Sequence, residues 1–368
     1  MTRQPDISFF ITESKIISGA ENAFVELANS FARKGLNVDF VMVRWPDNYG
    51  KNIYESVLDA RIEIVYPGAK RLRQSIFKLA QYLKSRKPKV SISTLNYSNI
   101  VCILAYLLAG RIGKLFVRVA NTSSVEAEQK NSKNKAVVLK FLYKFTKGVI
   151  CPSMGVAEDL RKVYNVKNVI TIPNPIPYDL QTKSQEPAEH KWLNNKALPL
   201  IVAGGRLCEQ KNFSLLIKAF AKVRTKKDVN LIIMGEGADR NKLEQLIAEL
   251  DLKENVDLIG QISNPFAFLA KSDLFVLSSI REGMPNMLLQ ALACGCPSVS
   301  TNCPSGPSEL IKDGENGFLT PVGDEDKMAE KILTALDTNF DKDQIIASVS
   351  SHKIENISNQ YLKTFGVL

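Results

Sequence analysis

The chain has 368 residues, of which 45% are hydrophobic and 23% are charged, and its formal net charge at pH 7 is +10. This composition excludes a disordered, collagen-like or low-complexity chain, and the length suits two domains. The longest apolar run, residues 100–109, is half of the roughly 20 residues that a membrane-spanning helix needs. No signal-peptide core precedes the first strand-like residues, so we expect a soluble, cytoplasmic protein.

Short apolar runs without alternation, typical of strands buried on both faces, are interleaved with helical patterns along the chain. In the first half they predict strands at residues 7–12, 38–43, 62–66, 90–94, 115–119, 149–152 and 169–172. The pattern lapses over residues 176–199, where three prolines and many polar residues indicate a linker. The second half then predicts strands at residues 200–203, 231–234, 256–259, 274–277, 298–300 and 318–319. Further helices are expected at residues 241–250, 286–293 and 354–365.

These elements predict an α/β protein of two Rossmann-like parallel-sheet domains that face each other across a cleft. The domains would span residues 1–175 and 200–353, joined by the linker 176–199. Residues 354–368 would form a C-terminal helix that could pack back on the first domain. Because parallel sheets bind ligands at the carboxyl ends of their strands, we expect the functional site in the cleft.

The positive charge lies in the first half of the chain. Residues 1–190 hold 28 Lys and Arg against 16 Asp and Glu, whereas residues 191–368 hold 20 against 22. This asymmetry predicts an anionic partner for the first domain. Nucleic acid is disfavoured, since no recognition motif and no aromatic stacking platform accompany the basic residues.

A membrane surface is the alternative anionic partner. The predicted helix at residues 71–84 has apolar residues at helical spacing (Leu72, Ile76, Leu79 and Leu83), surrounded by Arg71, Arg73, Lys78 and Lys84. These four basic residues could face anionic lipid at the inner membrane surface. The apolar stripe is the face expected of an ordinary surface helix packed on the core, and the two interpretations are compatible.

The six cysteines predict neither a disulfide scaffold nor a metal site. The spacing in Cys294-Gly-Cys296 is too tight for a zinc pair, and the chain has only two histidines. We therefore expect buried free thiols and no structural metal.

Two polar clusters follow predicted strands of the second domain. Gly205-Arg206 with Lys211 combines a close backbone approach with two cationic donors, which suits a pyrophosphate. The segment Arg281-Glu282-Gly283-Met284-Pro285-Asn286 precedes a helix whose N-terminus can bind an anion. Glu282 there can accept hydrogen bonds from ligand hydroxyls, and Gln290 lies about one turn inside the helix.

With these motifs in order, the chain resembles the retaining family 4 glycosyltransferases of the GT-B fold, over nearly its whole length. Residues 282–291 are similar to the signature E-G-x-P-N-x-x-x-E-A. Gly235-Glu236-Gly237 and the late loop at residues 305–309 also match. The resemblance implies an acceptor-side loop at Ser18, Gly19, Ala20 and Glu21. It implies donor binding by Gly205, Arg206, Lys211, Gly235, Ile262, Glu282, Gly283, Met284, Pro285, Asn286 and Gln290.

Two residues depart from the family's pattern. The second signature glutamate is Gln290, which carries no charge, so we expect altered ribose binding. Asn121 stands where many relatives carry a histidine, so a general base is absent from that loop. The implied catalytic residues are then Glu282, Arg206, Lys211 and Asn121, with the leaving phosphate helping to deprotonate the acceptor.

The resemblance implies transfer of a hexose or N-acetylhexosamine from a nucleotide sugar, with UDP the favoured nucleotide, to a lipid-linked, lipopolysaccharide or capsule-type glycan. No metal or other cofactor and no nucleic acid are expected, and the protein would work peripherally on the cytoplasmic face of the membrane. Two alternatives stay open. One is an inactive GT-B scaffold that binds glycan or lipid, favoured by Gln290 and by the missing histidine, and the other is a UDP-sugar 2-epimerase.

Overall fold

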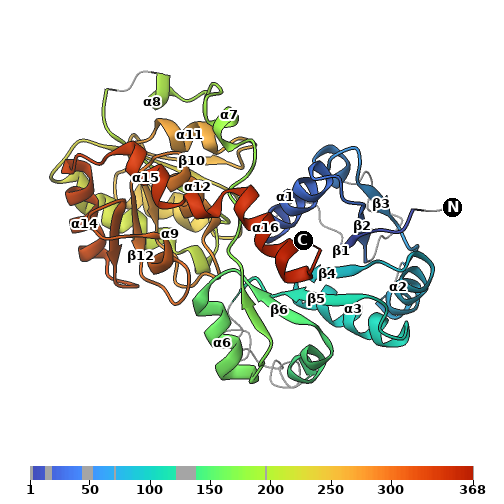
Figure 1. The fold of residues 1–368 in the computed structure, drawn as a ribbon. Coiled ribbons are helices and arrows are strands. Elements are labelled where there is room, and N and C mark those ends of the chain that lie inside the picture. The colour runs from blue at the N-terminus through green and yellow to red at the C-terminus, as the bar shows by residue number, and fades with distance from the viewer. Residues whose placement is uncertain are drawn as a thin grey trace. The chain divides into compact units, whose positions relative to one another are not determined.

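The computed structural model describes residues 3–12, 19–43, 53–69, 72–121, 138–194 and 197–367, apart from the side chains of residues 20, 72 and 73. The chain divides into two compact units (Figure 1). One comprises residues 1–177 together with 352–368, and the other comprises residues 178–351. Residues 178–199, which the sequence assigns to a linker, therefore belong to the second unit and contain α7 (Leu180–Ser184) and α8 (Lys191–Asn194).

The first unit is built on a seven-stranded parallel sheet of strand order β3-β2-β1-β4-β5-β6-β7. Its strands are β1 (Ile7–Ile11), β2 (Val38–Met42), β3 (Glu63–Val65), β4 (Val90–Thr94), β5 (Lys114–Arg118), β6 (Gly148–Cys151) and β7 (Val169–Thr171). Its helices are α1 (Gly19–Arg33), η1 (Ile53–Ser56), α2 (Leu72–Arg86), α3 (Asn96–Leu108), η2 (Tyr143–Phe145), α6 (Met154–Tyr164) and α16 (Ile354–Phe365).

Both faces of this sheet are covered by helices, which explains why its strands are continuous apolar runs. Alternate residues point to opposite faces. Phe9 and Phe40 pack with α1 and α16, whereas Phe10 and Val41 pack with α2, α3 and α6. The C-terminal helix α16 is thus part of the first unit's core, and its Phe365 ring lies 4.8 Å from that of Phe116.

The second unit has a six-stranded parallel sheet of strand order β10-β9-β8-β11-β12-β13. Its strands are β8 (Leu200–Gly204), β9 (Asn230–Met234), β10 (Val256–Gly260), β11 (Leu274–Leu277), β12 (Ser298–Thr301) and β13 (Gly317–Thr320). Its other helices are η3 (Glu209–Lys211), α9 (Phe213–Arg224), α10 (Arg240–Glu249), α11 (Phe266–Lys271), α12 (Asn286–Ala293), α13 (Pro307–Leu310), α14 (Glu325–Asp337) and α15 (Lys342–Ser348), and η4 (Ser350–His352) leads back to the first unit.

The two-sheet architecture predicted from the sequence is confirmed. Each predicted strand is present, and no strand end differs by more than one residue. The helix predicted at residues 71–84 is α2, which ends two residues later. Of its apolar stripe, Leu79 and Leu83 are buried and Ile76 packs against the same core, so this face of α2 lies inside the unit.

The strand order reverses once in each sheet, between β1 and β4 in the first unit and between β8 and β11 in the second. At such a switch point the loops leaving the two strands turn to opposite faces and open a crevice at their carboxyl ends. Ligands of doubly wound sheets bind there. The switch point of the second unit therefore marks where a candidate site should be sought.

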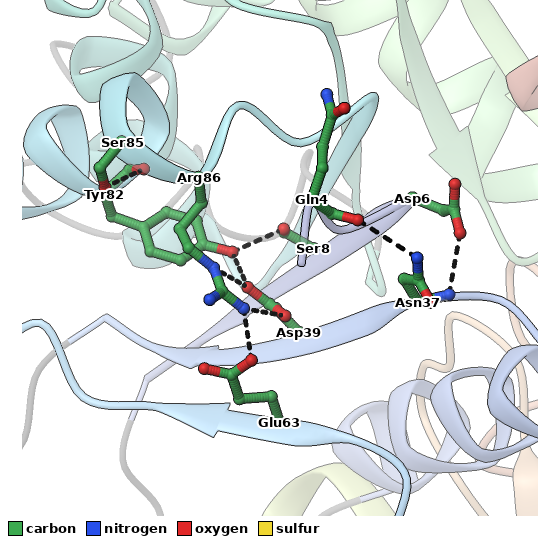
Figure 2. A network of polar contacts seen from close by, with 9 residues as sticks. All are labelled: Gln4, Asp6, Ser8, Asn37, Asp39, Glu63, Tyr82, Ser85 and Arg86. Carbon is green, nitrogen blue, oxygen red and sulfur yellow. Dashed lines mark hydrogen bonds and ion pairs between the residues drawn. The ribbon is translucent and has the colours of Figure 1, made fainter. Parts of the chain in front are cut away.

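A buried polar network fixes α2 to the amino ends of the strands of the first sheet (Figure 2). The Asp39 carboxylate accepts hydrogen bonds from Tyr82 Oη at 2.6 Å and from Arg86 Nη2 at 2.9 Å. Because Tyr82 donates its proton to Asp39, the Ser8 hydroxyl at 2.7 Å donates to Tyr82 Oη. Burial raises the pKa of Asp39, against the opposing effect of Arg86.

A buried cation, Arg118, lies at the carboxyl ends of the strands on the side of α16. The Arg118 guanidinium is fully buried and donates hydrogen bonds to Asn174 Oδ1 and, at 3.4 Å, to Thr94 Oγ1. Burial raises the pKa of Tyr361 on α16, and Arg118 opposes that shift. Ile176 N donates to His352 O at 2.8 Å, so the segment that enters the second unit and the segment that returns from it are held to one another within the first unit.

The cysteines agree with the expectation of free thiols, within the described part of the chain. All six cysteines are free thiols, and five are buried, while Cys208 is half-buried. No described helix combines the length and the apolar composition that crossing a membrane requires.

Candidate active site

The loop after β8 lies at the switch point of the second sheet. Gly205 follows the strand with a φ of +148°, and its backbone N–H donates to Met234 O at 2.9 Å. Two residues later, Leu207 N donates to Glu236 O at 2.9 Å. The β8 and β9 loops thus run side by side, joined through their backbones.

This close approach explains the glycines of the Gly235-Glu236-Gly237 turn. A Cβ on Gly235 would lie 1.9 Å from Gly205 O, and one on Gly237 would lie 2.1 Å from Leu207 O. The φ of Gly235, +137°, is also unfavourable for other residues. The turn is therefore a structural support for the loop that carries Arg206.

An ion pair crosses the switch point from the β8 side to the β11 side. Lys211 Nζ, at the end of η3, donates to Glu282 Oε1 at 2.5 Å. The Lys211 side chain is 19% exposed and that of Glu282 is 7% exposed, so the pair lies in a partly desolvated environment. Ser279 Oγ donates to the same carboxylate oxygen at 2.6 Å.

Two further polar groups at this position have no hydrogen-bond partner among the described residues. No described residue donates a hydrogen bond to Glu282 Oε2, because both hydrogen bonds go to Oε1. Arg206 is exposed and forms no hydrogen bond or ion pair with the residues that the structure describes. The site therefore presents one carboxylate oxygen, one ammonium group and one guanidinium group.

The N-terminus of α12 completes this arrangement. The helix starts at Asn286 after Pro285 and packs on β11 and β12. Its first turn leaves backbone N–H groups without partners inside the helix, which favours an anion.

The loop after β12 holds the residues that precede α12 in place. Ser305 Oγ donates to Gly283 O at 2.8 Å. Gly306 approaches so closely that a Cβ there would lie 2.5 Å from Pro285 Cδ. The chain between β11 and α12 is thus supported from a second strand end.

Cys303 lies close to the ion pair without adding charge to it. The side chain is buried, and burial raises the pKa of its thiol to about 12. Glu282 raises that pKa further and Lys211 lowers it, which places both charges near the thiol. The thiol is therefore neutral at physiological pH.

Most predicted donor-side residues belong to this one edge of the second sheet. Gly205, Arg206 and Lys211 follow β8, Gly235 follows β9, and Glu282 to Asn286 follow β11. Ile262 is half-buried two residues after β10. Gln290 is half-buried in the second turn of α12, and its side chain forms no hydrogen bond with a described residue.

The other predicted residues belong to the first unit. Gly19 begins α1, and the buried Glu21 accepts a hydrogen bond from Tyr54 Oη at 3.3 Å. Asn121 is exposed three residues after β5, and Lys78 and Lys84 are exposed on α2. Ser18 and Arg71 lie outside the described residues, as do the side chains of Ala20 and Arg73.

The sequence reasoning missed the hydroxyl and amide groups that support the site. Besides Ser279, Ser278 Oγ donates to Lys211 O at 2.8 Å, and Gln210 Nε2 donates to Arg281 O at 2.9 Å. The one signal was a pair of serines at the carboxyl end of an apolar strand. No three His, Cys, Asp or Glu side chains gather as a metal would require within the described ranges.

The chain is similar to known glycosyltransferases in sequence and in fold. Residues 184–349 match the family model described as glycosyl transferases group 1, and residues 17–180 match that of glycosyltransferase family 4. In curated proteins, the chain is 34% identical over 248 residues to a Campylobacter jejuni N-acetylgalactosaminyltransferase whose name specifies a diphospho-undecaprenol-linked substrate. That match covers 66% of this chain and 66% of the relative, just under two thirds of its length.

A second Campylobacter jejuni enzyme, an α-1,4-N-acetyl-D-galactosaminyltransferase also named for an undecaprenol-linked glycan, is 28% identical over 96% of both chains. Solved structures show the same fold at lower identity. Anabaena HepE in complex with UDP has a TM-score of 0.80 at 21% identity, covering 99% of this chain and 100% of that one. The apo galactosyltransferase WaaB has a TM-score of 0.76 at 20% identity and covers 98% of this chain and 99% of that one.

Proposed function

Because the chain belongs to the group 1 and family 4 glycosyltransferases and has their two-sheet GT-B fold, we propose that it is a retaining, metal-independent glycosyltransferase. It transfers a hexose or N-acetylhexosamine from a UDP-sugar to a lipid-linked or lipopolysaccharide-type glycan. The observation that carries the proposal is the pairing of Lys211 with Glu282 at the switch point of the second sheet. We assign the cation to the diphosphate of a nucleotide sugar and the carboxylate to its sugar.

The cationic groups bind the diphosphate of the donor, and the carboxylate binds its sugar. Arg206, Lys211 and the N-terminus of α12 bind the diphosphate and stabilise the negative charge that grows on it as its bond to the sugar breaks. Glu282 Oε2 accepts hydrogen bonds from the sugar hydroxyls. The acceptor oxygen then bonds to the anomeric carbon on the same face, and its proton passes to the departing phosphate.

The acceptor side of the proposal rests on the first unit and on the named relatives. Those relatives act on undecaprenol-linked glycans. The basic first unit suits an acceptor with a diphosphate or another anionic group, and a peripheral position on the cytoplasmic face of the membrane. In this proposal Asn121, which is exposed after β5, hydrogen-bonds to acceptor or sugar hydroxyls.

A nucleotide screen by thermal unfolding tests the donor. UDP at about 100 times its dissociation constant should add roughly 2.7 kcal/mol of stability and raise the melting temperature by several degrees. GDP, ADP and CMP are the matched controls, and we expect smaller shifts with them. The UDP shift should persist in EDTA, and its loss there would contradict a metal-independent site.

Gln290 offers a second test, in which a substitution should strengthen UDP binding. Replacing it with Glu should tighten UDP binding about tenfold, since a carboxylate is the stronger acceptor for ribose hydroxyls. Calorimetric titration of UDP would measure the change, with Gln290→Leu as the control that weakens binding. Equal affinity in all three proteins would show that this side chain does not contact the nucleotide.

The same residue motivates a second candidate function, that of an inactive scaffold that binds glycan or lipid. The Lys211–Glu282 pair argues against it, because a scaffold has no need of a partly desolvated charge pair at the switch point. Turnover of a UDP-sugar with an undecaprenyl-diphosphate-linked acceptor would exclude the scaffold. UDP binding without turnover on any such acceptor would favour it.

A further inference from the structure

Large apolar side chains are exposed together at one place on the first unit. Residues 138–142 are helical and continue into η2, and Val138 and Phe141 project from this segment with 48% and 57% of their surfaces exposed. Leu108, the last residue of α3, is 47% exposed. Exposed apolar side chains are ordinary when scattered, but a group of them indicates a contact surface.

The exposed side chains stand on a rigid base. Leu139, Leu142 and Tyr143 point inward and are buried in the core that α2, α3 and α6 share. Phe145 packs against that core, and its ring lies 5.2 Å from that of Phe141. Val138 and Phe141 are therefore held outward by the packing of their neighbours.

Cations surround this apolar group. Lys140 and Lys144 are exposed on the same segment, and Arg111, three residues beyond Leu108, is exposed. The Arg111 guanidinium stands 5.3 Å above the centre of the Phe145 ring, which joins the end of α3 to η2. Residues 96–121 and 138–157 contain no Asp or Glu. These two described stretches thus bring apolar and positively charged groups to the surface and carry no carboxylate of their own.

We propose that these six residues (Leu108, Arg111, Val138, Lys140, Phe141 and Lys144), the α3–η2 patch, dock the protein on an anionic lipid bilayer. Phe141 and Val138 enter the boundary between headgroups and acyl chains, and the three cations bind lipid phosphates. A protein partner would need a larger contact area with a complementary shape. The α3–η2 patch is small and its charged residues are all basic, which suits a fluid anionic bilayer. The inference rests on the proposed function only in that a lipid-linked acceptor resides in such a membrane.

The α3–η2 patch differs from the face that the sequence suggested. On the outer surface of α2, Phe77 is 66% exposed beside Lys78, and Lys84 lies two turns further on. Of the residues between the two lysines only Gln81 is exposed, and it is polar, so Phe77 has no exposed apolar neighbour along this stretch. This difference provides a matched control on the same unit.

The test is co-sedimentation of the full chain with vesicles of phosphatidylglycerol and phosphatidylcholine, compared with phosphatidylcholine alone. We expect binding to the anionic vesicles only, weakened by high salt. Phe141→Ser should weaken it about tenfold, and Lys140→Glu with Lys144→Glu should weaken it at least fivefold for each lysine. Phe77→Ser should bind as the wild type does. All these side chains are exposed, so melting temperatures and UDP binding should not change.

Three results would overturn the proposal. They are the absence of wild-type binding to anionic vesicles, unchanged binding by the Phe141→Ser and double-lysine variants, and loss of binding in Phe77→Ser instead. A dimer in sedimentation velocity that Phe141→Ser dissociates would make the α3–η2 patch a subunit interface and would overturn it as well. Since no arm requires turnover, a failed glycosyltransferase assay would leave this test unaffected.

Discussion

Replacing Glu282 with Gln is expected to lower kcat about a thousandfold, or roughly 4 kcal/mol in activation free energy. The substitution keeps the shape of the side chain but removes the charge that pairs with Lys211 Nζ at 2.5 Å. It also replaces one carboxylate oxygen by an amide NH2 group, which donates hydrogen bonds and cannot accept them from the sugar hydroxyls. The sugar is then held less firmly at the position from which its bond to phosphate breaks.

Steady-state kinetics with a UDP-sugar and a lipid-linked acceptor would measure this effect, and Glu236→Gln is the matched control. Glu236 lies in the neighbouring β9 loop, and its side chain is half exposed and paired with Arg240. We expect the control to retain turnover within about threefold. UDP affinity should change little in Glu282→Gln, since the diphosphate is bound by the cations. A variant that keeps wild-type kcat would remove Glu282 from the reaction.

The sequence predicted the strands of this fold so closely because of where they lie. Strands such as β1 and β8 are buried on both faces, so their residues are apolar without alternation and are bounded by polar residues or glycine. The extent of the linker was harder to predict. Residues 178–199 are rich in proline and polar groups, yet Asn264 Nδ2 donates to Lys183 O at 2.9 Å and holds part of this segment to the second unit.

The residues of the candidate site could each be predicted from the sequence, but the contact between Lys211 and Glu282 could not. The glycines and cations after β8 and the acid before α12 were each visible in the sequence. That Lys211 contacts Glu282, 71 residues away, depends on β8 and β11 being neighbours, which is a property of the strand order. The supporting Ser279 was not distinctive, because a serine at a strand end has many explanations.

The Asp39 network could not be predicted from the sequence either, because its contacts depend on how the elements pack. Its disruption is expected to cause the largest loss of stability. Asp39 lies in a strand and Arg86 at the end of a helix 47 residues later, and neither belongs to a motif. Their contact arises only when α2 packs across the sheet with its last turn over β2 (Figure 2). Tyr82, one turn earlier, then reaches the same carboxylate.

Asp39→Ala should therefore lower the free energy of unfolding by about 3–5 kcal/mol. The Arg86 guanidinium, whose side chain is only 11% exposed, would lose its buried partner, and the Tyr82 hydroxyl would lose its acceptor. Glu63→Gln is the matched control, since Glu63 contacts the same guanidinium from an exposed position, and it should cost less than about 1 kcal/mol. Urea unfolding of both variants would measure the difference. Equal losses would mean that Arg86 is held by its exposed partner and that burial of Asp39 contributes nothing, whereas the expected inequality would locate the attachment of α2 at Asp39.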